Sequence, residues 1–375
     1  MIQPVDYFDT FGYYTIGDIK TYSKYELMEL YNKVPQAFAW HFNDEVYGSY
    51  DWTVEPTQSL DELYRLRAEQ LRDQYDYIVL MYSGGYDCVN ILWTFLDNNI
   101  HIDELCTQYS REDRTTMMHE EVENFTFKKL DQIEQAHPEI KIRKLDLHDQ
   151  YMNWHTIASD MDTDYAYFHG SFCNANPLIR NTLPDFVKDY RDLINSGKKI
   201  AFVWGVDKPI VRLTDQGQWI ATFTDAMVHG SVGPYVPMSK NNKGSHELFY
   251  WSSTSPSIVI KQAHLIKKKF STPEKVNQLP HKPGWGQQPA GLDIVDVIYP
   301  RNFKFSETFY KGKGSIFHLG TKDWWWFDAN CESAEAWRKM MLSIEQSVSS
   351  FWLNDGVNMS SSLKSCISRD YILSK

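Results

Sequence analysis

The segment YDYIVLMYSGGYDCVNILWTFLDNN, from Tyr75 to Asn99, combines an apolar run, a glycine turn and an amphipathic pattern. The run Tyr77–Tyr82 has the length and composition of a buried strand. It stops at Ser83-Gly84-Gly85, where two glycines permit a tight turn. Apolar residues then recur at helical spacing, at Cys88, Ile91, Leu92, Phe95 and Leu96. The segment therefore predicts a strand, a turn and a helix in direct succession.

The same alternation extends to both sides of this segment. Ser59 and Glu62 have the spacing of a capping box, which predicts a helix leading into the first strand. The apolar face of that helix is expected at Leu60, Leu63, Leu66 and Leu71. Further strands are expected at Ile102–Thr107, Ile140–Leu147 and Ile200–Trp204, with helices at 115–138 and 185–197 between them. Strands that alternate with helices indicate an α/β fold with a doubly wound parallel sheet.

Three regions are predicted along the chain. Residues 1–57 form an aromatic-rich N-terminal extension with one helix, Lys24–Lys33, and otherwise irregular structure. Residues 58–208 form the doubly wound domain, and residues 209–375 form a mixed C-terminal region. In that last region we expect a hairpin with its turn at Asp215–Gln218, a helix at Pro256–Phe270, a loop at Thr272–Gly291, and a last helix at Glu332–Trp352 before a serine-rich tail.

The composition restricts the classes of protein to which the chain can belong. Asp and Glu number 49 and Lys and Arg number 38, so the net charge is -11, which disfavours a nucleic-acid-binding protein. The five cysteines form no CxxC pair, which argues against a disulfide framework and a structural zinc site. No apolar run has the length of a membrane span, and the first residues lack the pattern of a signal peptide. We therefore expect a cytoplasmic protein without membrane contact, and the sequence leaves the oligomeric state open.

The glycine turn has the properties of a phosphate-binding loop. In an open parallel sheet, ligands bind beyond the carboxyl ends of the strands, where Ser83–Gly85 is expected. Glycines bring backbone N–H groups close to an anion, and the following helix directs its positive N-terminus to the same point. Asp87 would repel a phosphate unless a cation lies between them, so its position predicts a Mg²⁺ site. The chain contains no GxxxxGK[ST] sequence, which excludes the common P-loop.

Residues Ser83, Gly84, Gly85, Tyr86 and Asp87 resemble the SGGxDS motif of the PP-loop ATP pyrophosphatase superfamily. This superfamily includes asparagine synthetase, NAD synthetase, GMP synthetase and several tRNA-modifying enzymes. The resemblance is short, but it lies after an apolar strand and before an amphipathic helix, which is the context that the motif requires. It implies a HUP-like α/β domain.

The resemblance also implies a specific reaction. The loop Ser83–Cys88 would bind the β- and γ-phosphates of ATP, and Asp87 would bind the Mg²⁺ that neutralises them. A substrate oxygen would attack the α-phosphorus, pyrophosphate would leave, and a nitrogen or sulfur nucleophile would attack the adenylated carbonyl. Thr107 is expected at the end of the second strand, where members of the superfamily commonly seat adenine. Such a site acts by charge stabilisation and alignment.

At Cys88 the sequence departs from the superfamily pattern, which usually has serine there. A thiol is a weaker hydrogen-bond donor than a hydroxyl, but the backbone N–H at this position is retained. We therefore interpret Cys88 as a substituted phosphate ligand. The competing interpretation is a catalytic thiolate at a helix N-terminus, which is disfavoured because pyrophosphate should fill that position.

Asp207 and Lys208 follow the predicted strand Ile200–Trp204 and are expected to face the same crevice. Asp207 would hold Mg²⁺ or a substrate amine, and Lys208 would stabilise charge on the α-phosphate or on the leaving pyrophosphate. The alternative is a surface turn with no role in chemistry. Further candidates for substrate recognition are Glu247, Tyr250 and Lys261, for which a core helix with an aromatic lead-in is the alternative.

Three functions remain open from the sequence. The first is an ATP-dependent ligase that adenylates a carbonyl or carboxylate for attack by an amine or ammonia, with an acceptor that the sequence does not name. The second is a nucleobase- or tRNA-modifying enzyme of the same superfamily, which the missing cysteine pairs and the negative charge disfavour. The third is a nucleotide-binding protein of this fold without turnover, a hypothesis motivated by Cys88.

Overall fold

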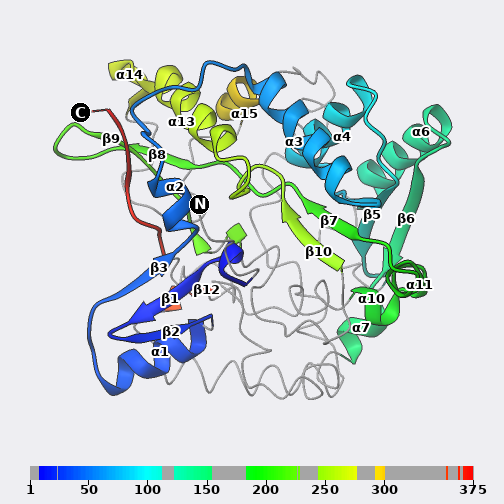
Figure 1. Ribbon diagram of the computed structural model, residues 1–375, viewed down its shortest axis with the longest axis horizontal. Coiled ribbons are helices and arrows are strands. Elements are labelled where there is room, and N and C mark those ends of the chain that lie inside the picture. The colour runs from blue at the N-terminus through cyan, green and yellow to red at the C-terminus, as the bar shows by residue number, and fades with distance from the viewer. Residues whose placement is uncertain are drawn as a thin grey trace.

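The computed structural model describes residues 8–22, 24–111, 122–153, 183–225, 227–228, 244–276, 292–299, 352–353, 362–363 and 366–374. Within these residues, one sheet has the strand order β10-β7-β4-β5-β6, and all of its neighbouring strands are parallel (Figure 1). Its strands are β4 (Tyr77–Met81), β5 (Glu104–Tyr109), β6 (Lys141–Asp146), β7 (Ile200–Trp204) and β10 (Gly244–Leu248). The predicted α/β class with a parallel sheet is confirmed.

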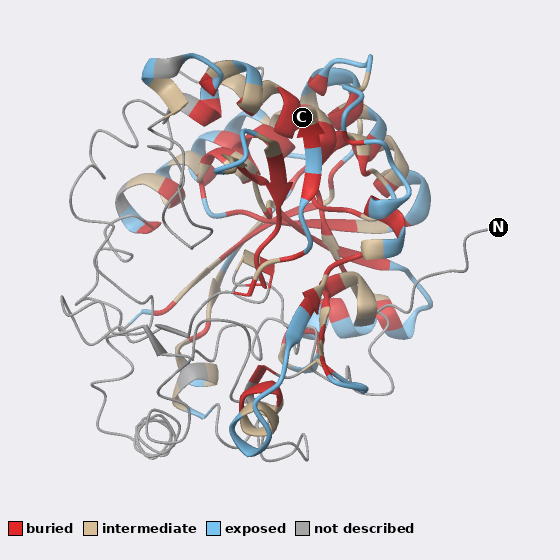
Figure 2. Cartoon of the chain, turned by 90° about the vertical axis from the view of Figure 1, so that its left-hand side faces the viewer, coloured by how far each residue is buried: buried red, intermediate tan, exposed pale blue. Residues whose placement is uncertain are grey.

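The central strands of this sheet form the core of the protein (Figure 2). Every residue of β7 is buried, and in β4 only Tyr77 is partly exposed. Such strands are continuous apolar runs because elements pack on both faces of the sheet. The edge strand β6 instead exposes Lys141 and Lys144. Lysines on an edge strand disfavour pairing with a further strand.

Helices cover the parallel sheet. Two of them, α3 (Leu60–Gln74) and α4 (Tyr86–Asp97), pack against each other and on β4. The helix α6 (Lys128–Ala136) packs on β6, and α11 (Lys188–Asn195) packs on β7. Two short helices, α7 (His148–Met152) and α10 (Leu183–Phe186), precede α11. The connections through α4 and α11 run in opposite directions along the sheet, and right-handed crossovers place such helices on opposite faces (Figure 1). Where the sequence predicts a single helix at 185–197, the structure has two helices, α10 and α11.

Local chemistry sets the start of α3. The predicted capping box is formed, because Ser59 Oγ accepts from the Glu62 N–H at 3.2 Å and the Glu62 carboxylate accepts from the Ser59 N–H at 3.0 Å. The prediction that Leu66 lies on the buried face is wrong, since its side chain is 45% exposed. Tyr64 and Arg67 are buried on that face instead.

The helix before β6 and the end of α11 also have clear local signals. The helix predicted at 115–138 is described from Val122 onward, as the π-helix η2 (Val122–Phe127) and then α6, which ends before Pro138. At the end of α11, Gly197 has a φ of +88°, and the Lys198 N–H donates to the Leu193 carbonyl at 3.1 Å. This is a Schellman motif, which ends the helix at the residue where the sequence predicts its end.

The N-terminal residues contain more regular structure than the sequence predicts. After η1 (Phe8–Phe11), an antiparallel sheet with the order β2-β1-β3 is formed by β1 (Tyr13–Ile16), β2 (Ile19–Thr21) and β3 (Phe38–His41). The helix α1 (Lys24–Lys33) has the predicted bounds, and α2 (Asp44–Gly48) follows β3. The expectation of otherwise irregular structure is wrong, because buried aromatic side chains such as Trp40 and Phe42, stacked at 5.3 Å, give these short strands a core.

A second antiparallel sheet has the order β13-β9-β8. The predicted hairpin is confirmed as β8 (Ile210–Leu213) and β9 (Trp219–Thr222). The strand β13 (Tyr371–Ser374) pairs with β9 and lies in what the sequence predicts only as a tail. Two further strands, β11 (Trp352–Leu353) and β12 (Ser362–Leu363), pair with each other.

The remaining helices lie on the C-terminal side of β10. The predicted helix at 256–270 is confirmed as α13 (Ser257–Phe270). The loop predicted at Thr272–Gly291 begins instead with α14 (Pro273–Val276). Its residues 277–291 lie outside the described part of the chain, and so do residues 332–351 of the last predicted helix. A short helix, α15 (Leu292–Ile298), packs against α13. No helix in the described ranges has both the length and the apolar character needed to span a bilayer.

The parallel sheet takes its fifth strand, β10, from beyond residue 208, where the sequence predicts the end of the nucleotide-binding domain. This strand contains two polar residues whose partners are distant in sequence. Trp204 Nε1 donates to His246 Nδ1 at 2.9 Å, and Arg67 Nη2 lies 2.7 Å from Glu247 Oε2. Because each of these two polar side chains has a hydrogen-bonding partner, β10 packs in the sheet although its sequence is not apolar.

A buried ion pair joins the N-terminal sheet to the C-terminal strands. Lys24 Nζ lies 2.8 Å from Asp225 Oδ2, and neither side chain is exposed. Tyr14 donates to the same oxygen at 2.7 Å, and the Cys366 N–H donates to Asp225 Oδ1 at 2.9 Å. A buried ion pair is tolerated only when its remaining hydrogen bonds are made. This network therefore holds α1, β1 and the segment before β13 in one arrangement.

Candidate functional site

The strand order places two loops next to each other at the carboxyl edge of the sheet. From β4 the chain continues to β5 and β6 on one side, whereas β7 and β10 lie on the other side of β4. The strand order thus reverses between β4 and β7, and ligands bind in the crevice beyond the strand ends at such a switch point. Ser83–Gly85 leaves β4 at this point, and Gly205–Lys208 leaves β7. The two predicted segments are therefore neighbours in the structure.

The turn after β4 depends on Gly84. Its φ of +75° lies in the left-handed region that favours glycine. A Cβ atom at this position would lie 2.9 Å from Thr126 Oγ1, closer than real Cβ contacts allow. Gly85 has an extended conformation and is the N-cap of α4. The first-turn N–H groups of α4 have no earlier carbonyl in the helix to bind, so this end of the helix favours an anion.

The Cys88 thiol is directed into the turn and belongs to its internal hydrogen bonds. Cys88 Sγ accepts from the Ser83 N–H at 3.3 Å, lies 3.5 Å from Ser83 Oγ, and donates to the Gly85 carbonyl at 3.2 Å. Burial raises the pKa of the Cys88 thiol above its ordinary value, although the hydrogen bonds from Ser83 oppose this shift. The thiol therefore stays protonated at neutral pH, which does not favour the interpretation as a nucleophile.

We expect Cys88 in the folded protein to react slowly with iodoacetamide at neutral pH, because alkylation needs an accessible thiolate. Mass spectrometry of peptides from native and urea-unfolded protein measures the labelling of each cysteine. Cys106 is the matched control, because burial raises the pKa of its thiol to about 12. Rapid labelling of native Cys88, at a rate near that of the unfolded chain, would restore the interpretation as a reactive thiolate.

A close approach at Gly205 brings the first turn of α4 against the end of β7. A Cβ atom on Gly205 would lie 2.9 Å from the Cβ of Asp87 and 3.2 Å from the backbone nitrogen of Cys88. Because two of the nearest atoms belong to the backbone, no rotation of a side chain would relieve this contact. The glycine therefore allows α4 and the loop after β7 to meet at Asp87.

Three charged side chains meet at this point. Lys208 Nζ lies 2.7 Å from Asp87 Oδ1 and 2.8 Å from Asp207 Oδ1, so one ammonium group bridges a carboxylate of α4 and one of the loop after β7. The side chains are mostly buried, with 15% of Lys208, 16% of Asp207 and 27% of Asp87 exposed. The sequence predicts all three as site residues, and the structure brings them together.

Burial and charge act against each other in this cluster. Burial alone would lower the pKa of Lys208, but Asp207 and Asp87 raise it well above its ordinary value, so the ammonium form is retained. Burial raises the pKa of Asp207, and Lys208 opposes that shift. The cluster therefore keeps the positive charge of Lys208 at neutral pH, in a place where polar atoms are shielded from water.

Two tyrosines from the C-terminal side complete the surroundings of Asp87, and the sequence does not predict their contacts. The Tyr299 hydroxyl donates to Asp87 Oδ1, and its ring lies 5.7 Å from Lys208 Nζ. The Tyr250 hydroxyl donates to the Asp87 carbonyl at 2.8 Å and accepts from Asn90 Nδ2 at 3.0 Å. Both tyrosines are buried, and burial raises the pKa of each well above its ordinary value, so both stay hydrogen-bond donors.

Two other predicted ligand residues have structural contacts of their own. Thr107 lies inside β5 and not at its end, because the strand continues to Tyr109. Its buried hydroxyl donates to the Tyr82 carbonyl at 2.6 Å and so ties β5 to the residue before the loop.

Tyr86 is the first residue of α4, and its side chain is buried. At Tyr86 the backbone N–H, in the first turn of α4, is therefore the group suited to an anion.

The other candidates for recognition have partners away from the crevice. Glu247 binds Arg67 and also accepts from the Tyr75 hydroxyl. Lys261 binds Glu55 at 2.6 Å. Of the three residues proposed from that part of the sequence, only Tyr250 reaches the cluster around Asp87.

Asp87 and Asp207 supply oxygen ligands of the kind that Mg²⁺ prefers. Among the described residues, no group of three or more His, Cys, Asp and Glu side chains is arranged to hold a metal ion. Protein sites for Mg²⁺ commonly use one or two carboxylates, and water and substrate phosphates complete the shell. The two carboxylates therefore fit an ion that binds together with a phosphate ligand.

We expect Gly84→Ala to weaken binding of pyrophosphate by at least about tenfold, because the new methyl group would meet Thr126 and the φ of +75° would be strained. Gly217→Ala is the matched control, since Gly217 has a φ of +78° but nothing within 4 Å of the added Cβ. Both variants should lose about 1–2 kcal/mol of stability from backbone strain. Calorimetric titration and thermal unfolding separate the two effects. Equal affinities in the two variants would contradict a phosphate-binding role for the loop.

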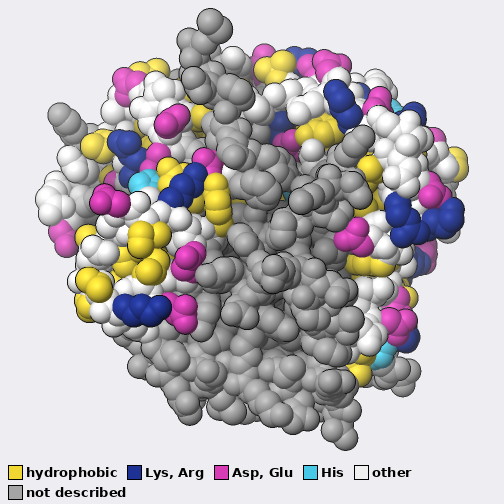
Figure 3. All heavy atoms as spheres, turned by 60° about the horizontal axis from the view of Figure 1, so that its bottom comes forward, with side chains coloured by type: hydrophobic (Ala, Val, Ile, Leu, Met, Phe, Trp, Pro, Cys, Tyr) yellow, Lys and Arg dark blue, Asp and Glu magenta, His cyan; other side chains and the backbone are white. Residues whose placement is uncertain are grey.

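Charges of both signs are intermixed on the surface of the described residues. On the face shown in Figure 3, Lys and Arg side chains lie beside Asp and Glu side chains. Lys144, for example, pairs with Asp131 at 2.6 Å, and Arg111 pairs with Asp146 at 2.8 Å. The described surface in this view offers no continuous basic patch, and the absence of a nucleic-acid partner stays a prediction.

Comparison with known proteins adds no relative: the chain matches no model of a protein family, and no curated protein is significantly similar to it.

Proposed function

We propose that this protein is an ATP-dependent adenylating enzyme of the PP-loop, HUP-like type, which converts ATP to AMP and pyrophosphate. The reaction would activate a carbonyl or carboxylate for attack by an amine or ammonia. The observation that carries the proposal is the junction at the switch point of the sheet. There the glycine turn after β4, the N-terminus of α4 and the Asp87–Lys208–Asp207 cluster meet.

The chain's own groups have distinct tasks in this proposal. The N–H groups of the turn and of the first turn of α4 bind the terminal phosphates. Asp87 and Asp207 would hold Mg²⁺, which when bound supplies neutralisation of the phosphate charge. The buried ammonium of Lys208 stays protonated and stabilises negative charge on the α-phosphate and on the leaving pyrophosphate.

Alignment is the other contribution of the site. Phosphoryl and nucleotidyl transfers need little covalent chemistry from the protein, so positioning and charge stabilisation account for most of the rate. Gly205 lets the first turn of α4 and the loop after β7 approach closely, and Tyr250 and Tyr299 hold Asp87 through its carbonyl and its carboxylate. A site with these fixed contacts requires little rearrangement during the reaction.

The experiment that tests this proposal is identification of the products of Mg-ATP by phosphorus NMR, in the presence of carboxylates and amines as acceptors. AMP and pyrophosphate are expected with at least one acceptor pair. Formation of ADP and phosphate would refute the adenylation mechanism. Tight binding of ATP without turnover under any acceptor condition would instead support a nucleotide-binding protein of this fold.

A further inference from the structure

The glycine turn is fixed from outside by one side chain of the π-helix. Thr126 lies near the end of η2 and is buried, with 1% exposed. Its hydroxyl Oγ1 donates to the Ser83 carbonyl at 3.0 Å. The same oxygen would lie 2.9 Å from a Cβ atom on Gly84. Thr126 thus contacts both of the residues at which the chain leaves the strand and turns.

The two backbone groups of Ser83 are held from different directions. Its N–H donates to Cys88 Sγ at 3.3 Å, within the turn, and its carbonyl accepts from Thr126, which belongs to another helix. The Ser83 carbonyl and the Gly84 N–H share one planar peptide group, so the hydrogen bond from Thr126 also sets the direction in which the Gly84 N–H points. Loss of the bond from Thr126 would leave the Ser83 backbone with its hydrogen bond to Cys88 within the turn.

The segment that carries Thr126 is itself anchored on the sheet. Phe127 packs edge-on against Tyr109, the last residue of β5, with ring centroids 5.1 Å apart. Lys144 Nζ on β6 lies 4.7 Å from the Phe127 ring centroid, and the side chain of Leu130, in the next turn, is fully buried. The irregular π geometry, which occurs often at functional sites, continues here into a regular helix packed on β6. The Thr126 hydroxyl therefore reaches the turn from a segment that is packed on β5 and β6.

We propose that Thr126 is a positioning residue that holds the Ser83–Gly85 turn in its phosphate-binding shape. The effect on nucleotide affinity rests on the proposed function, whereas the effect on the turn itself does not. The hydroxyl acts through Ser83 and touches no reacting atom. A threonine that only fills space in the core would serve equally well as valine, which has the same shape without the hydroxyl.

The test compares Thr126→Val and Thr126→Ser with the matched control Thr94→Val. Thr94 is also a buried helical threonine, and its hydroxyl donates to the Asn90 carbonyl at 2.8 Å, away from the turn. Two readouts are measured in the folded proteins: affinity for Mg²⁺ with α,β-methylene-ATP by calorimetry, and hydrogen exchange of the 83–88 amides without ligand. Thermal unfolding provides the common measure of lost stability.

We expect Thr126→Val to bind the nucleotide about tenfold more weakly and to exchange the 83–88 amides several-fold faster. Thr126→Ser should restore both readouts, and Thr94→Val should lose stability without changing either. The proposal is overturned if Thr126→Val matches Thr94→Val in both readouts, or if Thr126→Ser is as impaired as Thr126→Val. If the wild-type protein does not bind the nucleotide, the proposed function fails, and amide exchange alone then decides the role of Thr126.

Discussion

Asp87→Asn is expected to lower the rate of ATP cleavage by about 10³-fold while the protein remains folded. Asp87 is the acidic residue in the first turn of α4, and its carboxylate is bound to Lys208 at 2.7 Å and to Tyr299. Asparagine keeps an oxygen for these two donors, and Lys208 keeps its contact with Asp207 at 2.8 Å. The substitution therefore removes charge from the site and leaves its shape.

The measurement is the rate of AMP formation with the acceptor that supports turnover, together with the thermal unfolding temperature. Asp192→Asn is the matched control, because Asp192 is exposed in α11 and loses the same charge far from the crevice. Wild-type rates are expected for that variant. Retention of more than about a tenth of the wild-type rate by Asp87→Asn would exclude a part for this carboxylate in charge neutralisation.

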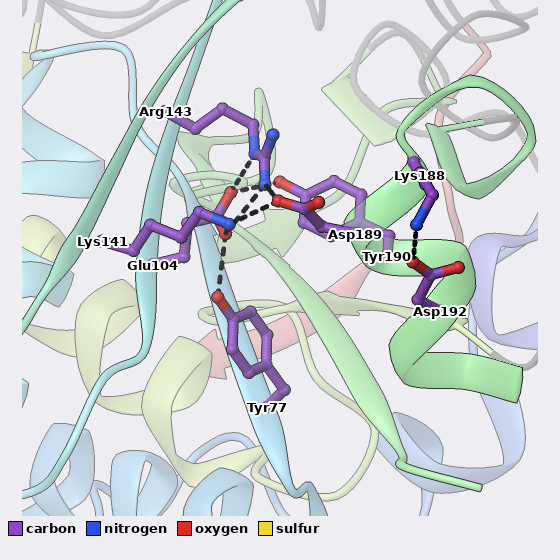
Figure 4. Close-up of polar contacts among 8 residues, drawn as sticks. All are labelled: Tyr77, Glu104, Lys141, Arg143, Lys188, Asp189, Tyr190 and Asp192. Carbon is purple, nitrogen blue, oxygen red and sulfur yellow. Dashed lines mark hydrogen bonds and ion pairs between the residues drawn. The ribbon is translucent and has the colours of Figure 1, made fainter. Parts of the chain in front are cut away.

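Glu104→Gln is expected to lower the free energy of unfolding by about 3 kcal/mol or more. Glu104 is the first residue of β5, so it lies at the amino edge of the sheet, and its side chain is fully buried. Figure 4 shows its polar contacts. Its carboxylate lies 2.5 Å from Arg143 Nε and accepts from the hydroxyls of Tyr190 at 2.6 Å and Tyr77 at 2.9 Å. Glutamine removes the buried one of the two carboxylates that pair with Arg143, the other being Asp189 at 2.8 Å, and replaces one acceptor oxygen with a donor.

Urea unfolding of Glu104→Gln and Asp192→Asn measures this effect against an exposed ion pair. Asp192 pairs with Lys188 one turn earlier in α11, and both side chains are more than half exposed (Figure 4). Such pairs contribute about 0.5 kcal/mol or less. At temperatures where it is folded, Glu104→Gln should keep wild-type nucleotide affinity, because the network lies at the other end of the strands. Equal stabilities of the two variants would show that the buried network contributes nothing beyond an exposed pair.

Patterns that depend on local chemistry predict the fold well. The strands β4 and β7 are continuous apolar runs, the capping box starts α3, and Gly197 ends α11. Each of these signals lies within a few residues of the structure that it specifies. The prediction fails at Leu66, because the helical spacing of apolar residues does not indicate that Arg67 is buried and the neighbouring Leu66 is exposed.

The elements that the sequence does not predict are stabilised by distant residues. His246 and Glu247 give β10 a polar sequence, and their partners, Trp204 and Arg67, are 42 and 180 residues away. The strand β13 is only four residues long and is defined by its pairing with β9. A local pattern carries no information about such partners.

The same division holds within the candidate site. The glycines and Asp87 are recognisable because they lie in one short motif, and Lys208 follows a clear strand. The contacts of Tyr299 and Tyr250 with Asp87 cross 212 and 163 residues, and that of Thr126 with Ser83 crosses 43. The aromatic lead-in to α13 is the one sequence signal that points to Tyr250, and nothing local marks Thr126 or Tyr299.

Calorimetric titration of the wild-type protein with α,β-methylene-ATP, with and without Mg²⁺, tests the central claim most directly, because it needs no acceptor. We predict one site per chain, with a Kd on the order of 10 μM in the presence of Mg²⁺ and binding at least about tenfold weaker without it. We also predict that Gly84→Ala loses most of this affinity while Gly217→Ala keeps it. Absence of binding up to millimolar nucleotide, or binding that is the same in both glycine variants, would contradict a nucleotide-phosphate site at the switch point of the sheet.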